Sequence, residues 1–212
     1  MIQEINVGNI PNDDNGDTIR DAFIKVNNNF TDLDTTKQDI NTFSTGLFAQ
    51  TALSNSISYA SGEASIIGTG VGSLVVPANT FKVGDSFIAK MCGTLTCANN
   101  EILHIHIKSN GVTIIDTLQY TMPAATGKYW DLVLDFTITK LGAATVGELF
   151  ANGVFSYNKN ASNAIEGIHF GQISNTVFNT TVSNTLTITA QWITNNASNA
   201  IRSQNFTLTK VY

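Results

Sequence analysis

The carboxylates that could support catalysis lie too far apart for the chemistry they suggest. Asp131 and Asp135 share one face of a predicted strand, four residues apart, which separates them by roughly 13 Å. Glycoside hydrolysis requires two carboxyl groups about 5–10 Å apart. The chain has three histidines and no G-x-S-x-G motif for a nucleophilic serine. We therefore interpret both aspartates as solvated surface groups and predict no enzymatic activity.

Two histidines have the one spacing in the chain that is typical of metal ligands. His104 and His106 alternate with apolar residues, so both should lie on the polar face of a strand. Three copies of the chain would bring six such nitrogens together around an axis. The other interpretation is a pair of ordinary histidines that face solvent or a neighbouring subunit. We favour the second, and predict no metal and no cofactor.

A short repeat suggests a polar binding surface. The hexapeptide Asn-Ala-Ser-Asn-Ala-Ile starts at Asn160 and again at Asn196, and both copies fall between predicted strands. If the two loops emerge at the same end of a sandwich, their amides and hydroxyls could hold the hydroxyl groups of a glycan. The alternative is two solvated turns without a ligand. The candidate binding residues are Asn160, Ser162, Asn163, Asn196, Ser198 and Asn199.

The elements that would carry these residues are short strands. From residue 73 to 212 apolar and polar residues alternate with a period of two, as in Trp130–Ile138, which predicts eight to ten antiparallel strands. Asn110-Gly111 predicts a hairpin turn. Asp116 falls on the apolar parity of the second hairpin arm, so we expect a bulge or a hydrogen-bonding partner there. The economical architecture is a two-sheet sandwich of the jelly-roll kind. Short strands of this kind that run to the end of the chain resemble the trimeric heads of viral fibres and of the tumour-necrosis-factor/C1q type.

A helix is predicted upstream of the strands, over residues 17–48, with Asp17 or Thr18 as its N-terminal cap. Apolar residues recur there at alternating steps of four and three, a seven-residue repeat. One helix cannot bury so narrow a stripe alone, and two phenylalanines suit a wide seam, so we predict a three-stranded coiled coil. The alternative is one amphipathic helix packed on its own domain. The predicted seam is Ile19, Phe23, Val26, Phe30, Leu33, Ile40 and Leu47, interrupted by Lys37 and Ser44.

Composition excludes several classes of partner. The 212 residues are 42% hydrophobic and 13% charged, with a net charge of −5. Residues 1–51 hold eight acids against three bases, and residues 52–212 hold eight of each. A neutral remainder without a basic patch argues against binding nucleic acid. The sequence has no apolar run of membrane-spanning length and no secretory signal at its start, so we expect no membrane insertion.

Cysteine usage points to a reducing compartment during assembly. Cys92 and Cys97 are five residues apart in one predicted strand, which places them on opposite faces and prevents their pairing. The stretch from Gly68 to Gly72 has glycine spacing like a phosphate-binding loop. It precedes a strand pattern rather than a helix, so we interpret it as a connector or tight turn.

The N-terminal stretch INVGNIPNDDNGDTIRDAFIKVNNNFTDLD resembles a short module of structural proteins in tailed bacteriophages and some other large-virus particles. The N-V-G start, the D-x-G-D turn and the A-F-x-x-V-N-x-N-F helix carry the resemblance over about 30 residues; Asp14-Asn15-Gly16-Asp17 departs slightly from the usual turn. The run TLTITAQW…NFTLTK is similar to the ends of viral fibre heads. The resemblance implies a virion protein that trimerises, and no chemistry.

These observations predict four segments and one function. Residues 1–16 form a virion-proximal segment, 17–48 the stalk, 49–72 a neck or linker, and 73–212 the head. We expect a homotrimeric viral fibre, made in the host cytoplasm and located on the virion. Its N-terminus would bind a virion or tail protein, and its head would bind a host receptor, which we expect to be a glycan. The alternatives are a purely structural virion component without a receptor and a tailspike-like glycan hydrolase.

Overall fold

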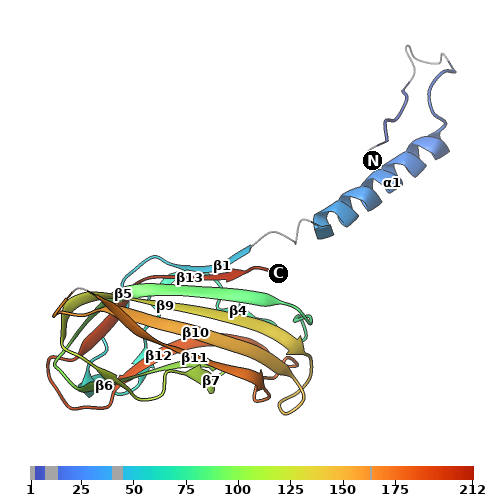
Figure 1. Cartoon of the computed structure of the whole chain (residues 1–212). Helices are drawn as coiled ribbons and strands as arrows, with labels where there is room; N and C mark the ends of the chain where they lie inside the picture. The colour runs from blue at the N-terminus through green and yellow to red at the C-terminus, as the bar shows by residue number, and fades with distance from the viewer. Residues whose placement is uncertain (1–2, 8–13, 40–44, 163) are drawn as a thin grey trace. The chain divides into compact units, whose positions relative to one another are not determined.

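A computed structural model describes residues 3–7, 14–39, 45–162 and 164–212. The chain divides into an N-terminal unit, up to Phe43, and a larger unit, Ser44–Tyr212, here called the β unit. Figure 1 shows one helix in the first unit and layered strands in the second. The prediction of a mainly β, antiparallel sandwich after an N-terminal helix is therefore confirmed at this level.

The N-terminal unit contains the helix α1 (Ile19–Asp39), and Gln3, upstream of it, is hydrogen-bonded to the helix. The Thr18 hydroxyl accepts a hydrogen bond from the Asp21 amide and donates one to the Asp21 carboxylate, which caps the helix as predicted. Gln3 and Asn29 exchange two hydrogen bonds between backbone and side chain. These contacts give the short unit a defined start. None of the helices that the structure describes is long and apolar enough to cross a membrane.

Within this unit the predicted seam is uncovered. Ile19, Phe23, Phe30 and Leu33 are 56–79% exposed, and Val26 is half-buried. Ile40 lies outside the described residues. An apolar row left in water costs free energy that burial against another surface would recover.

The last seam position was assigned wrongly. Leu47 lies in strand β1 (Thr45–Gln50) and packs against the core of the β unit. Strand β1 pairs with the C-terminal strand, Thr45 opposite Lys210, so its backbone groups gain sheet partners that a continued helix would not offer. Tertiary pairing outweighs the heptad spacing here, and α1 ends at Asp39.

The predicted linker, residues 49–72, is likewise part of the β unit. Ile57 and Ile66 are buried in its core, and Ile57 bridges Ile201. The glycine run holds strand β3 (Gly70–Gly72), paired with β1, so its interpretation as a connector is corrected. A Cβ on Gly70 or Gly72 would lie 2.3 Å or 2.1 Å from a backbone oxygen of β1. Glycine is needed here because β3 lies too close to the backbone of β1 for a side chain, and not because the segment must be flexible.

Two antiparallel sheets build the β unit. The first has seven strands in the order β11-β10-β9-β5-β13-β1-β3, and the second has the path β2-β12-β6-β7, with β4 on β12 and β8 on β6. Ten of the described strands, β4 to β13, lie within residues 73–212, at the upper end of the predicted number. The remaining bounds are β2 Ala64–Ser65, β4 Val75–Val76, β5 Ser86–Cys97, β6 Glu101–Ser109, β7 Val112–Asp116, β8 Tyr120–Met122, β9 Ala125–Lys140, β10 Glu148–Asn158, β11 Ile165–Asn175, β12 Asn184–Trp192 and β13 Ala200–Lys210, with a short 3-10 helix at Tyr59–Ser61.

The strands alternate as the sequence predicts. Burial alternates residue by residue along β5 and β6 and along β9 from Tyr129 to Thr139. The inward residues form one core that includes Trp130, Trp192 and Phe206. The turn at Asn110 and Gly111 has positive φ at both residues and joins β6 to β7 as predicted. The β6–β7 register shifts at Ile114, two residues before Asp116, and the Asp116 carboxylate accepts a hydrogen bond from the Leu118 amide, so both the expected bulge and the expected partner are found in this arm.

Candidate functional site

The β unit has two ends that differ in their relation to the chain termini. Thr45 pairs with Lys210 and Lys210 with Phe87, so the chain enters and leaves the unit at one end, here called the proximal end. Thr96 pairs with Ala200 and Cys97 with Ala125 at the other end, here called the distal end. Both copies of the repeat fall at the distal end, between β10 and β11 and between β12 and β13. Both loops therefore emerge at one end, which was the condition for a shared polar surface.

The first repeat loop is fastened to the start of β9. The Asn160 side chain accepts a hydrogen bond from the Thr126 amide at 3.0 Å and donates one to the Thr126 hydroxyl at 3.2 Å. The Ser162 hydroxyl accepts a hydrogen bond from the Ala164 amide. Asn163, the third candidate in this loop, lies outside the described residues. The outer part of this loop is exposed, so Ser162 remains accessible.

The second repeat loop is built around a carboxylate that the sequence analysis missed. Glu101, at the start of β6, is 8% exposed and accepts hydrogen bonds from the Asn196 and Asn199 amides at 2.8 Å each. The Thr194 hydroxyl donates to the same carboxylate. Asn196 also accepts from the Ser198 hydroxyl and amide, and Asn199 is 1% exposed. These two asparagines therefore hold the loop in shape and do not present their side chains to a ligand.

The hydrogen bonds also set the charge state of this carboxylate. Donation by the Thr194 hydroxyl, and then by Asn199 and Asn196, holds the pKa of Glu101 below its ordinary value, although burial opposes the shift. The carboxylate thus stays ionised and serves as the acceptor for three donors. The role of Glu101 is to shape the distal end.

A surface hollow of about 320 Å³ lies at the distal end, on the outer face of the seven-stranded sheet. Register places Arg202 opposite Thr94 and Thr94 opposite Tyr129, so one row of outward side chains crosses three adjacent strands. We call this the Arg202 hollow, and its lining is Ser56, Thr94, Leu95, Thr96, Gly127, Ala200 and Arg202.

Arg202 gives this hollow a positive charge. Its Nε lies 3.5 Å from the Thr94 hydroxyl, and no carboxylate forms an ion pair with it in the part of the chain that the structure describes. On the other side of Thr94, and outside the lining, Tyr129 is 65% exposed. The sequence analysis did not name Arg202 as a candidate. An arginine on the polar parity of a strand, next to the second repeat, was the signal that could have identified it.

The two candidate metal ligands form a stacked pair on the outer face of the other sheet. The rings of His104 and His106 are 3.7 Å apart between centroids. His104 Nε2 lies 3.3 Å from Asp116 Oδ1, and His106 Nδ1 lies 3.7 Å from Glu63 Oε1. Over the described ranges no three His, Cys, Asp or Glu side chains are grouped to hold a metal ion.

Burial governs the protonation of His106. Desolvation, and then the neighbouring His104, lower the pKa of His106, while Glu63 and Asp116 oppose the shift. Glu63 itself accepts hydrogen bonds from Lys108 and Thr189. Glu63 immediately precedes β2, Lys108 lies on β6 and Thr189 on β12. The cluster therefore links these three strands through hydrogen bonds, which is a structural role.

The remaining chemical candidates lie apart. Asp131 and Asp135 are outward residues of β9, opposite Ser156 and Asn152 of β10, and they do not meet. Cys92 and Cys97 are both free thiols, as their opposite faces predicted.

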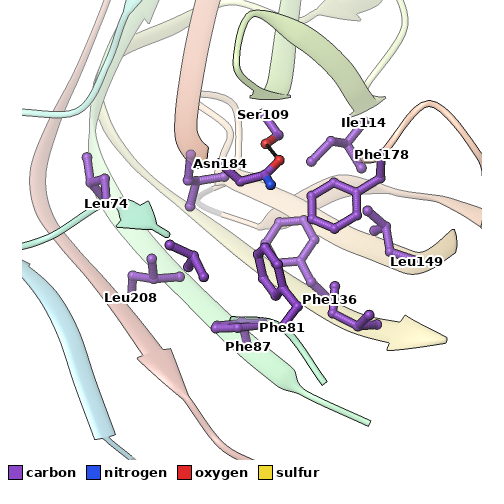
Figure 2. Close-up of a pocket in the computed structure, with 13 residues that line it drawn as sticks. Leu74, Phe81, Phe87, Ser109, Ile114, Phe136, Leu149, Phe178, Asn184 and Leu208 are labelled. Atoms are coloured by element: carbon purple, nitrogen blue, oxygen red, sulfur yellow. Dashed lines mark hydrogen bonds between the residues drawn. The ribbon is translucent and has the colours of Figure 1, made fainter. Parts of the chain in front are cut away.

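An apolar cavity of about 70 Å³ lies between the sheets near the proximal end. Figure 2 shows Phe81, Phe136 and Phe178 on one side of it, and the hydrogen bond between Ser109 and Asn184 on another. That bond is 2.7 Å long and satisfies the polar groups at the cavity wall. A cavity with such a lining has too few polar partners to hold water, and it offers nothing to a polar ligand.

Comparison with known proteins adds no assignment. No protein-family model and no curated protein matches this chain. The resemblance of the N-terminal stretch to viral structural modules therefore remains an expectation from the sequence.

Proposed function

We propose that this chain is a homotrimeric viral fibre protein that attaches a virion to a host-cell receptor through the distal end of the β unit. The observation that carries the proposal is the exposed apolar row of α1, where Ile19, Phe23, Phe30 and Leu33 are 56–79% exposed. A row with heptad spacing is buried well by copies of itself. Sister chains are the occupants that this spacing fits best.

The topology of the β unit supports a head with a free outer end. The first strand, β1, and the last, β13, are neighbours in one sheet, and β12, β6 and β7 are neighbours in the other. This order agrees with a jelly roll. Because the chain enters at the proximal end, the distal end is the part of the unit farthest along the strands from the entry point. A receptor site belongs there.

Three heads on one stalk would convert weak contacts into adhesion. A shallow polar site on each head can have low affinity, and linkage makes the second and third contacts effectively intramolecular. The N-terminal segment would bind a virion or tail protein. In this proposal the chain has no catalytic step.

Light scattering of the full chain tests the proposal. A trimer has a mass of about 68 kDa, three times 22.8 kDa, and a mass of about 23 kDa would overturn it. Binding of the full chain to an array of glycans tests the attachment role separately. A trimer that binds neither the array nor host cells would instead favour a purely structural virion component.

A further inference from the structure

We infer that the Arg202 hollow binds a sugar that carries a carboxylate, an inference that rests on the proposed attachment function and names its ligand class. The first argument is charge. A guanidinium without a carboxylate partner in the described residues can donate two parallel hydrogen bonds to a ligand carboxylate. Several lysines, by contrast, are paired with carboxylates, such as Lys108 with Glu63 and Lys210 with Asp85.

The second argument is the kind of group around the charge. Thr94, Thr96 and the exposed Ser56 supply hydroxyls, and the Thr96 hydroxyl, which accepts from the Gly127 amide at 3.0 Å, keeps its own proton to donate. Hydroxyls around one cation suit a ligand with many hydroxyls and one negative charge.

The third argument is an exposed aromatic side chain next to the lining residue Thr94, although it is not itself part of the lining. Tyr129 is the cross-strand neighbour of Thr94 and is 65% exposed. An exposed ring offers an apolar face and a hydroxyl in one side chain, which matches the mixed faces of a pyranose. The volume of about 320 Å³ lies at the lower end of the range for ligand pockets, so one sugar ring fits rather than a long chain.

Gly127 keeps the hollow open. It has φ +57°, and a Cβ placed on it would meet nothing within 4 Å, so the space above it is free. Asn160 and Thr126, which bond to each other next to it, fix the rim. The first repeat loop thus borders the site that it was predicted to form, although its amide is engaged in the rim.

Titration of the full chain by isothermal calorimetry and by amide NMR shifts tests this inference. Methyl glucuronide and methyl sialoside are the acidic probes, methyl glucoside is the neutral match, and sodium acetate is the anion without a sugar. We expect an acidic sugar to bind at least tenfold more tightly than methyl glucoside or acetate. The largest shifts should lie at Thr94, Thr96 and Gly127.

Two variants make the test specific. Arg202→Gln should weaken binding of the acidic sugar at least tenfold. Lys90→Gln, which removes an exposed cation from β5 on the same sheet face, should leave it within twofold. If Arg202→Gln did not fold, the shifts in the unaltered chain would still locate the site.

The results that would overturn this inference differ from those that would overturn the proposed function. Equal binding of glucuronide and glucoside, acetate binding as tight as the sugar, or shifts confined to other residues would overturn the inference. A trimer that binds a neutral glycan elsewhere would leave attachment standing and remove only the Arg202 hollow. A monomeric mass would remove the fibre and not the hollow.

Discussion

Glu101 is the residue on which the shape of the distal end depends. Three donors, from Thr194, Asn196 and Asn199, converge on its buried carboxylate. We predict that Glu101→Gln lowers the free energy of unfolding by about 1–3 kcal/mol. The glutamine NH2 group cannot accept a hydrogen bond, so at least one of the three donors would lose its acceptor. Urea denaturation followed by tryptophan fluorescence measures the change.

The same carboxylate predicts acid sensitivity. Its folded pKa is lowered, so its contribution is complete above the unfolded value near 4.5 and is lost as pH falls through the folded pKa. Glu101→Gln should therefore reduce the loss of stability below that value. Asp131→Asn, at an exposed position, is the matched control. Equal acid sensitivity of all three proteins would contradict this role.

His106 predicts a second effect of pH in a different range. Burial lowers its pKa from 6.5, so the folded state resists protonation, and stability falls as pH drops below 6.5. We predict a lower thermal midpoint at pH 5.5 than at pH 7.5, and a smaller difference in His106→Gln. His104, Asp116, Glu63 and Lys108 face the ring and stay unchanged in that variant.

The control for this prediction is His169→Gln, because His169 is an exposed residue of β11. It should keep the full difference between the two pH values. Calorimetry at both pH values decides the matter, and an unchanged difference in His106→Gln would assign the effect to another group.

At the scale of elements, the pairing of β5 with β13 depends on one glycine. A Cβ on Gly93 would lie 1.9 Å from the Arg202 carbonyl oxygen and 2.8 Å from the Ser203 Cα. Beside it the register shifts between Ser203 and Asn205, and the buried Ser203 bonds to Gln50 and Ser54. The glycine allows the bulge that ties β1 and the following segment to the sheet.

We predict that Gly93→Ala lowers the free energy of unfolding by about 1–3 kcal/mol, because the backbone must move to admit the methyl group. Gly46→Ala is the control, because its Cβ would meet nothing within 4 Å. Denaturant unfolding measures both. Equal stability of the two variants would show that the strands separate at little cost.

Alternation in the sequence was sufficient to predict the strands but not where the β unit begins. A period of two predicted the burial in β5, β6 and β9 because one side of each strand faces the core and the other faces outward. Leu47 and the stretch around Ile57 were misassigned because their partners, in β13, are about 150 residues away, and such pairing leaves no local pattern. Of the site, the two loops were predicted from their repeat, whereas Glu101 and Arg202 depend on register between distant strands.

At the scale of the whole molecule, we expect the stability of the two units to have different origins. The β unit has a continuous core of its own. Helix α1 has 21 residues, about 32 Å at 1.5 Å per residue, and three consecutive asparagines with low helix propensity, Asn27 to Asn29. Isolated helices of such composition are marginal in water, so α1 needs the partners that its exposed row invites.

We therefore predict that the helical signal of the full chain at 222 nm melts at a temperature that rises with protein concentration, because association stabilises the helix by mass action. Phe23→Gln should lower that midpoint, since it removes an exposed seam residue. It should leave the unfolding of the β unit, followed by the fluorescence of the buried Trp130 and Trp192, within error of the unaltered chain. Asn28→Gln, off the seam on the same helix, is the control for helix propensity. A helical midpoint independent of concentration, and equal in the Phe23 and Asn28 variants, would show that α1 is stabilised within its own chain and would remove the physical basis for the stalk.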